Sequence, residues 1–456
     1  MPLTDSPAVV VARFLKANNY PQTLEVFLQE AGLSESSITL NANDWTIEKI
    51  LEEKRRLDAS QAYEKTPDDD DDDSNDTKWT TPAPTVPHAP STAATSNVLC
   101  VRGDPSSTQI LTTTADRKVS VLSARPSSSY QTMSTVSDND SPVLSLTLVD
   151  GYCLTTSMSG ELTVRQGDNY GSIVDRVRDH TKYAVASAVL RDGDDSNSSI
   201  IIATAGWDKK VHIYHVWANK PPFGLGQPIH TITLASVPEA ILFVRNPATN
   251  APFLILSRRD STFLYYYSSQ PPQSLAPYSP SNSSFTPSSL ALHPSDPSLV
   301  AIATSHLPHM HLIIVRLLFP DHPNRRDPAS SSTSTGFSSG DSAAAISERQ
   351  KQQAKEREEA AVVVHATTMA PQTPYSTPAV VWRPNGTGVY VNGDDGAVRG
   401  IEAKTGKVAG TKVRTLWCGL LDGREVLLSG GFDKRLVVWE CSRRSLDSDS
   451  PGTGIS

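Results

Sequence analysis

The residues best suited to metal chemistry are a group of histidines in the second half of the chain. His306, His309 and His311 lie within six residues of sequence, and His293 lies upstream. Three imidazoles could bind Zn²⁺, but Asp296 is the one nearby acidic or thiol side chain that could complete a ligand set. We therefore interpret these histidines as surface and turn residues, and we predict neither a metal nor another cofactor.

The sequence offers no motif for phosphate binding or for a serine nucleophile. A phosphate-binding loop needs the pattern GxxxxGK[ST], whose backbone N–H groups wrap the phosphates. The nearest string, from Gly400 to Lys407, has five residues between its glycines and no hydroxyl residue after the lysine. The GxSxG pattern of a nucleophile elbow does not occur. We predict no catalytic residues and expect a protein that is not an enzyme.

A third pattern, an aspartate followed by a short apolar strand, recurs within residues 97–441. Five copies contain the aspartate. A sixth copy has Gly160 where the aspartate is expected, and a seventh has lost the aspartate and has His309 near the turn. Each copy follows another β-rich run, so the pattern predicts pairs of strands joined by tight turns. In the five full copies an apolar residue lies six positions after the aspartate: Asp116–Leu122, Asp208–Tyr214, Asp260–Tyr266, Asp395–Ile401 and Asp433–Trp439.

The repeated aspartates are interpreted as structural residues. A tight turn leaves backbone N–H groups unpaired, and a short carboxylate can accept their hydrogen bonds. The residues assigned to turn capping rather than to catalysis are Asp116, Asp208, Asp260, Asp395 and Asp433.

The repeated strings resemble the WD-repeat β-propeller family, whose repeat contains an aspartate turn, a strand and a Trp-Asp pair. Here the pair is present only as Trp439-Glu440, and the Gly-His signature of the family only as Asp179-His180. The resemblance implies a mainly β fold of seven blades with about 44 residues each, interrupted by an insertion at about 320–361. It also implies that a strand from just before residue 97 completes the last blade and closes the ring.

Basic residues lie beside the aspartates of four repeats, and the resemblance places these turns on one face of the propeller. Cations gathered there could recognise an acidic or phosphorylated segment of a partner protein. There are two alternatives. Lysine and arginine are common at this position of the repeat and then have no binding role, or they form a phosphoinositide site, because the double arginine at 258–259 resembles the motif of lipid-binding propellers. The predicted partner-binding residues are Arg117, Lys118, Lys209, Lys210, Arg258, Arg259, Lys434 and Arg435.

Residues 6–34 resemble the lissencephaly-homology (LisH) motif, a helical hairpin. Pro7 suits the first position of a helix, whereas Asn18-Asn19 and Gly32 can end two helices in left-handed conformations. A further amphipathic helix is expected at 44–59. A short hairpin buries too little surface to be stable alone, so we expect a homodimer. The predicted dimerisation residues are Val10, Phe14, Leu24, Phe27 and Leu28.

The remaining segments and the composition limit the functional classes. Residues 67–96 contain six consecutive aspartates, Asp68–Asp73, and several prolines, which predicts an extended linker. The stretch 442–456 is expected to be a disordered tail. A net charge of −8 argues against nucleic-acid binding, and no apolar run of about 18 residues could span a membrane. Four scattered cysteines and the polar N-terminus indicate an intracellular protein, in the cytoplasm, the nucleus or both.

The sequence thus predicts a LisH module, an acidic linker and a seven-bladed β-propeller. The predicted function is that of a scaffold or adaptor, which dimerises through its LisH module and presents its propeller to partner proteins of a multiprotein complex. The alternatives are an enzyme with a site in the central channel and a phosphoinositide-binding propeller. An enzyme would need convergent carboxylates, a nucleophile–base pair or a metal cluster.

Overall fold

The computed structural model divides the chain into two units, Met1–Asp72 and Asp73–Ser456, and each is described by itself. The described residues are 7–34, 47, 83–84, 86–90, 96–125, 130–167, 169–192, 199–217, 224–268, 286–319, 360–402 and 414–441. Apart from isolated residues, the predicted helix at 44–59, most of the predicted linker, the insertion at about 320–361 and the tail at 442–456 therefore lie outside the described part.

The first unit contains the predicted helical hairpin, formed by α1 (Pro7–Ala17) and α2 (Pro21–Ala31). Asn19 between the helices and Gly32 after the second have φ angles of 59° and 63°. These are the left-handed exits that asparagine and glycine adopt most readily, and the N–H of Gly32 donates to the carbonyl of Leu28. The hairpin expected from the LisH resemblance is confirmed. No helix among the described residues is long and apolar enough to cross a membrane.

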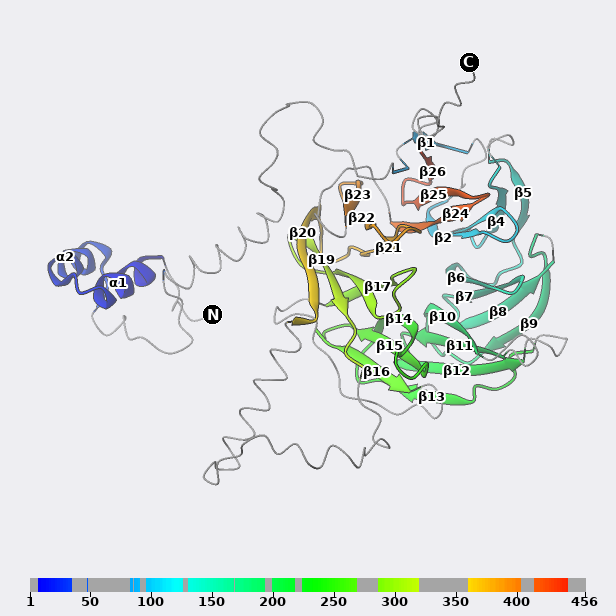
Figure 1. Cartoon of the computed structure of the whole chain (residues 1–456), viewed down its shortest axis with the longest axis horizontal. Helices are drawn as coiled ribbons and strands as arrows, with labels where there is room; N and C mark the ends of the chain where they lie inside the picture. Colours follow the sequence, from blue (N-terminus) through cyan, green and yellow to red (C-terminus); the bar gives the residue numbers. More distant parts are fainter. Residues whose placement is uncertain are drawn as a thin grey trace, which may run out of the picture. The chain divides into compact units, whose positions relative to one another are not determined.

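The second unit contains seven antiparallel sheets, numbered here as blades in chain order (Figure 1). Blade 1 is β2 (Val98–Asp104), β3 (Gln109–Thr114), β4 (Val119–Ser123) and β5 (Thr132–Val136). Blade 2 is β6 (Val143–Val149), β7 (Tyr152–Ser157), β8 (Glu161–Gln166) and β9 (Ser172–Arg178). Blade 3 is β10 (Ala184–Asp192), β11 (Ser199–Gly206), β12 (Lys210–Trp217) and β13 (His230–Thr233).

The other four blades follow the same order from the inner to the outer strand. Blade 4 shows β14 (Pro238–Arg245), β15 (Pro252–Arg258) and β16 (Leu264–Ser268). Blade 5 is β17 (Pro287–Leu292), β18 (Leu299–Thr304), β19 (His309–Arg316) and β20 (Val362–Pro371). Blade 6 shows β21 (Val380–Trp382), β22 (Gly388–Asn392) and β23 (Val398–Glu402). Blade 7 is β24 (Thr415–Leu421), β25 (Arg424–Gly430), β26 (Leu436–Glu440) and β1 (Val86–His88).

The blades close into a ring. The inner strands contact one another in the circular order β2, β6, β10, β14, β17, β21, β24 and again β2, as Figure 1 shows. The predicted seven-bladed propeller is therefore confirmed. The closing strand is β1, which pairs with β26 and places Pro87 opposite Trp439. β1 is the strand expected from just before residue 97 to complete the last blade, and it lies within the segment 67–96 that the sequence indicated as a linker.

The hydrophobic core consists of seven clusters, each between two neighbouring blades. Middle strands therefore bury both of their faces, which explains why β11 is a continuous apolar run from Ile200 to Ala203 with every residue buried. Outer strands have an exposed side, and the residues of β9 are at most partly buried. The ring thus holds rigid the turns that join its second and third strands.

Candidate interaction surface

The turns between the second and third strands of the blades lie together at one end of the propeller. This follows from the closed ring, because blades in one circular order all direct this turn to the same side. We call this end the turn face and define it by the turns at 114–118, 157–161, 206–210, 258–263, 304–311, 393–397 and 431–435.

Five of these turns share one backbone conformation. In blade 1 the N–H of Arg117 donates to the carbonyl oxygen of Thr114 at 3.1 Å, and Arg117 has a φ of 69°. This is a tight turn followed by one left-handed residue, a common hairpin connection. The equivalent left-handed residues of blades 2, 3, 6 and 7 are Gly160, Lys209, Gly396 and Lys434.

Four of the predicted aspartates stand directly before the left-handed residue. The Oδ1 atoms of Asp208, Asp395 and Asp433 each accept a hydrogen bond from the N–H two residues further on, at 3.3, 2.9 and 3.2 Å. The carboxylate of Asp116 pairs with the ammonium of Lys118 at 2.8 Å. The hydrogen bonds to Asp208, Asp395 and Asp433 are those that turn capping requires.

The fifth predicted aspartate, Asp260, does not hold this position. In blade 4 the strands pair Ser257 with Leu264, so the turn contains one residue more than the turns above. Asp260 itself has the left-handed φ of 63°. The equal spacing in the sequence therefore aligned Asp260 with the other aspartates, although Asp260 lies one position later, at the left-handed residue of its turn.

Blade 2 was also shifted by one residue in the sequence interpretation. Gly160 has a φ of 84° and is the left-handed residue, so Ser159 stands where other turns have aspartate. A Cβ at Gly160 would lie 2.2 Å from the carbonyl oxygen of His180, which excludes an aspartate there. The N–H of Ser159 donates to Oγ of Ser141 at 2.9 Å, and its hydroxyl donates to Asp140 at 3.0 Å.

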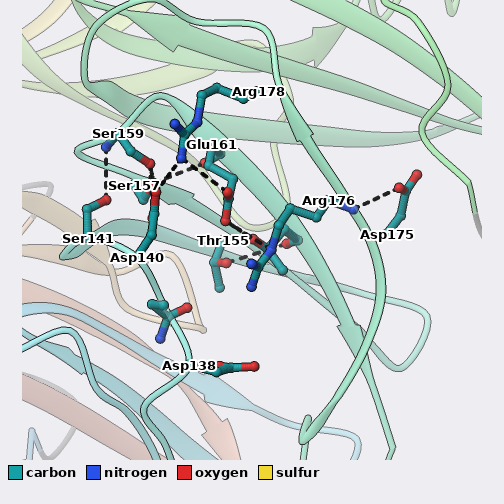
Figure 2. A network of polar contacts seen from close by, with 12 residues as sticks. Asp138, Asp140, Ser141, Thr155, Ser157, Ser159, Glu161, Asp175, Arg176 and Arg178 are labelled. Atoms are coloured by element: carbon teal, nitrogen blue, oxygen red, sulfur yellow. Dashed lines mark hydrogen bonds and ion pairs between the residues drawn. The ribbon is translucent and has the colours of Figure 1, made fainter.

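A charged network surrounds this turn of blade 2 (Figure 2). Glu161 is largely buried and lies 3.1 Å from Nε of Arg176 and 3.5 Å from a guanidinium nitrogen of Arg178. Arg178 also pairs with Asp140. These ion pairs join the third and fourth strands to the loop before the blade. The hydrogen bonds of Ser159 and these ion pairs therefore hold this turn in place of an aspartate.

Blade 3 contains the most complete buried network. Nδ1 of His180 lies 3.0 Å from Asp208, and its Nε2 lies 3.0 Å from the hydroxyl of Thr204. The side chains of His180 and Asp208 are only 2% and 4% exposed. Burial acts to raise the pKa of Asp208, but hydrogen bonds from His180, Thr181 and Lys210 outweigh it and leave that pKa below its usual value.

The possibility of a metal site has to be judged on this same network. Among the described residues, only His180, Asp208 and His212 place three possible ligand atoms within 4.8 Å of one another. Both ring nitrogens of His180 are already hydrogen-bonded to Asp208 and Thr204. The arrangement therefore ties the turn to the preceding loop, as the histidine and aspartate of the WD-repeat resemblance imply.

The histidines singled out in the sequence lie in two places. The rings of His306 and His311 are 4.3 Å apart, and Nδ1 of His311 lies 3.1 Å from Nε2 of His365. His365 was missed because it follows the insertion, far away in sequence. His293 instead contacts Gly386, at 3.2 Å from its carbonyl oxygen, and His309 begins β19 rather than standing within a short turn.

The eight predicted partner-binding cations differ in their contacts and in their exposure. Three engage neighbouring side chains: Lys118 pairs with Asp116, Arg258 lies over the ring of Tyr265 at 3.9 Å, and Arg259 pairs with Glu239 at 2.6 Å. Arg117, Lys209, Arg259, Lys434 and Arg435 are exposed, whereas Lys118, Lys210 and Arg258 are partly buried. All eight lie in turns of the turn face.

Exposed aromatic residues of the turn face were missed in the sequence. Trp207 is 39% exposed and Phe432 is 58% exposed, and each directly precedes a turn aspartate. Tyr183 stacks on Trp207 with ring centroids 5.0 Å apart. The signal was a large aromatic residue at the exposed position of a tight turn, where small or polar residues are usual.

The inner strands enclose a central cavity of about 570 Å³, the place where a propeller enzyme would have its site. Its buried Arg383 donates to both carboxylate oxygens of Glu425, at 2.8 and 2.7 Å. Burial raises the pKa of the Cys418 thiol, so this thiol stays protonated at neutral pH and is a poor nucleophile.

Comparison with known proteins supports the division seen in the structure. Residues 8–38 match the family model described as the LisH domain of UCP007778, and residues 278–440 match the model of the beta-propeller domain of the same family. The chain joins a LisH-type hairpin to a seven-bladed propeller. No curated protein matches the chain. LisH and propeller domains are both protein-interaction modules, and function then depends on their exposed residues.

Proposed function

We propose that this LisH–propeller chain is a non-catalytic scaffold that pairs two copies through its hairpin and presents the turn face to partner proteins. The observation that carries the proposal is the exposure of large aromatic side chains on that face. Trp207 and Phe432, in two of the turns of this face, are 39% and 58% exposed, and Tyr375, which lines a pocket together with Phe432, is 92% exposed. Aromatic residues among cations are enriched at protein interfaces.

The hairpin supports the pairing of two copies. Of the predicted dimerisation residues, Val10 is already buried in the single chain, whereas Phe14, Leu24, Phe27 and Leu28 are only partly buried. No residue of α2 is fully buried. Two short helices cannot bury enough apolar surface to be stable by themselves. Packing of two hairpins as a four-helix bundle would cover these side chains.

The absence of catalysis is part of the proposal, and the paired charges around the central cavity support it. Arg383 and Glu425 satisfy each other, and the Cys418 thiol is kept protonated. An activated nucleophile would instead need a lowered pKa or an adjacent base.

Light scattering of the full chain tests the pairing. Phe27→Asp should convert a dimer at micromolar concentration into a monomer, because a charge would have to be buried in the bundle. Gln29→Asp adds the same charge at an exposed position of the same helix and should leave the dimer intact. A monomeric wild-type chain, or a dimer that survives Phe27→Asp, contradicts the proposal.

Affinity purification with mass spectrometry tests the turn face. Trp207→Ser combined with Phe432→Ser should remove the partners that the wild-type chain retains. Leu420→Ser is the matched control, because Leu420 is 48% exposed but lies beside the turn joining β24 to β25, at the opposite end of the propeller. Equal partner loss in both variants would speak against a specific role of the turn face.

A further inference from the structure

A small pocket opens on the turn face where blades 6 and 7 meet. It has a volume of about 160 Å³, and its lining includes Tyr375, Asp394, Arg414 and Phe432. Tyr375 comes from the loop before β21, whereas Arg414 directly precedes β24. The N–H of Arg414 donates to the carbonyl of Gly430 at 2.8 Å, so the backbone that carries this arginine is fixed to the sheet.

Among the residues that the structure describes, Arg414 is a cation without an acidic partner. Its guanidinium carbon lies 4.3 Å from the ring centroid of Phe432, and within the described residues its side chain makes no hydrogen bond or ion pair. Burial lowers the pKa of Arg414, as expected for a charge that is removed from water. Arg383, by contrast, is buried with Glu425 at hydrogen-bonding distance.

An arginine held in this way raises the free energy of the unbound protein. A partly buried charge is costly unless an opposite charge compensates it. One face of the guanidinium lies against Phe432, which favours a planar cation there. The edge of the guanidinium is then suited to donate parallel hydrogen bonds to an anionic group in the pocket.

The walls of the pocket show which anion fits. Asp394 accepts hydrogen bonds from Ser376 and Thr373, and Asp433 accepts one from the N–H of Arg435. Both carboxylates line the same pocket. Phosphate groups are usually bound by several arginines, and two neighbouring carboxylates would repel a dianion more than a monoanion. A single carboxylate suits the lone arginine better.

The rim of the pocket is aromatic. Tyr375 is 92% exposed and Phe432 is 58% exposed. Exposed aromatic side chains next to a partly desolvated arginine are the residues that most often dominate binding free energy at protein interfaces. They offer an apolar neighbour of the bound carboxylate a surface to pack on.

We propose that the pocket between blades 6 and 7 binds an acidic side chain of an extended partner segment, with Arg414 pairing with its carboxylate and Tyr375 and Phe432 contacting an adjacent apolar side chain. The inference rests on the proposed function, since it specifies the partner of the turn face. It also concerns a cation that is not among the eight predicted from the turns.

Selection from displayed peptides tests the inference with the full chain. Three libraries of 12-residue peptides carry glutamate, glutamine or phosphoserine at a fixed central position, with random neighbours. The glutamate library should be enriched most, with apolar residues next to the glutamate. The best peptide should bind Arg414→Met more weakly by about tenfold or more, as expected when one member of a charge pair at an interface is removed.

Arg125→Met is the control, because it removes an exposed cation that lies after β4, outside the turn face, and should leave the affinity nearly unchanged. Equal losses in both variants would show a diffuse charge effect and overturn the inference. Preference for phosphoserine, or no preference for glutamate over glutamine, would overturn it as well. If peptides bind but ignore Arg414→Met, the inference fails while a peptide-binding turn face survives. If no peptide and no partner protein binds the face, both fail.

The stability of the free protein gives a readout that needs no ligand. Because Arg414 has no acidic partner in the described part of the chain, Arg414→Met should leave the melting temperature unchanged or raise it. Binding residues are often kept at some expense of stability. A fall of several degrees would show that Arg414 stabilises the fold, and would contradict its role as a residue held ready for a ligand.

Discussion

Asp208 stands before the left-handed residue of its turn, whereas Asp260 is itself the left-handed residue. The first carboxylate accepts hydrogen bonds from His180, Thr181 and Lys210. The second lies in a turn with one additional residue. Identical residues at identical spacing from a strand therefore have different environments, because the register of the strand pair decides which residue turns the chain.

This difference predicts unequal effects of the same substitution. Asp208→Asn should lower the free energy of unfolding by about 1–3 kcal/mol, because a buried charged acceptor loses its hydrogen bonds. Asp260→Asn should change it by less than about 0.5 kcal/mol, since asparagine tolerates the left-handed conformation and the site is exposed. Urea denaturation measures both, and equal effects would contradict the assignment.

The histidine cluster of blade 5 predicts a dependence of stability on pH. Burial, followed by the nearby His306, His365 and His309, lowers the pKa of His311 to about 4, whereas an unfolded histidine has a pKa of about 6.5. Between these values the unfolded chain binds more protons than the folded one. Stability is therefore full above pH 6.5 and declines as the pH falls towards 4.

His311→Gln should weaken this decline. Between pH 7 and pH 5 the wild-type chain should lose about 1 kcal/mol more than the variant, a value reduced from the full shift because the group is partly exposed to solvent. Denaturant titrations at the two pH values measure the difference. Parallel pH profiles would show that His311 does not carry the effect.

At the scale of elements, the strands that could be recognised from sequence are those buried on both faces. The runs before and after each turn, such as β11 and β12, are apolar because blades cover them on either side. Outer strands such as β9 contain alternating charged residues, including Arg176 and Arg178, and lack a distinct apolar pattern. The rim of the pocket at Tyr375 was unpredictable for a related reason, since the exposure of a loop tyrosine depends on how two blades meet.

The closing strand β1 predicts different effects of two truncations. A chain beginning at residue 83 keeps β1 and should retain the stability of the propeller. A chain beginning at residue 97 loses the pairing of Val86 with Glu440 and the contact between Nε2 of His88 and the carboxylate of Glu440, at 3.3 Å. Its free energy of unfolding should fall by about 1–3 kcal/mol, and the uncovered edge of β26 should promote aggregation.

Denaturation midpoints and light scattering compare the two truncated chains directly. Both lack the LisH-type hairpin, so differences between them report on residues 83–96 alone. Equal midpoints for both chains would show that β1 adds nothing to the closed ring.

At the scale of the whole molecule, the first and last blades meet at a tightly packed seam. The indole of Trp417 in β24 fills the space beside Gly103 in β2, where a Cβ would lie 2.4 Å from the ring. The surrounding cluster joins Val98 and Ile110 of blade 1 to Leu428 of blade 7. The seam therefore depends on a residue without a side chain at position 103.

Gly103→Ala should lower the free energy of unfolding by about 1–3 kcal/mol, because the added methyl group overfills the seam. Gly171→Ala is the control, since a Cβ at Gly171 would meet no atom within 4 Å. Calorimetry compares the two variants. A stable Gly103→Ala protein would mean that the seam can open to admit the methyl group.

The pairing of β1 with β26 also has a consequence for the synthesis of the protein on the ribosome. Val438 is the partner of His88, and about 350 residues separate them. At about 5–20 residues per second, β1 waits on the order of 20–70 s for the strand that completes its blade. The hairpin formed by α1 and α2 emerges before β1. If two chains pair through this hairpin as proposed, they can associate while the seventh blade of each propeller is still incomplete.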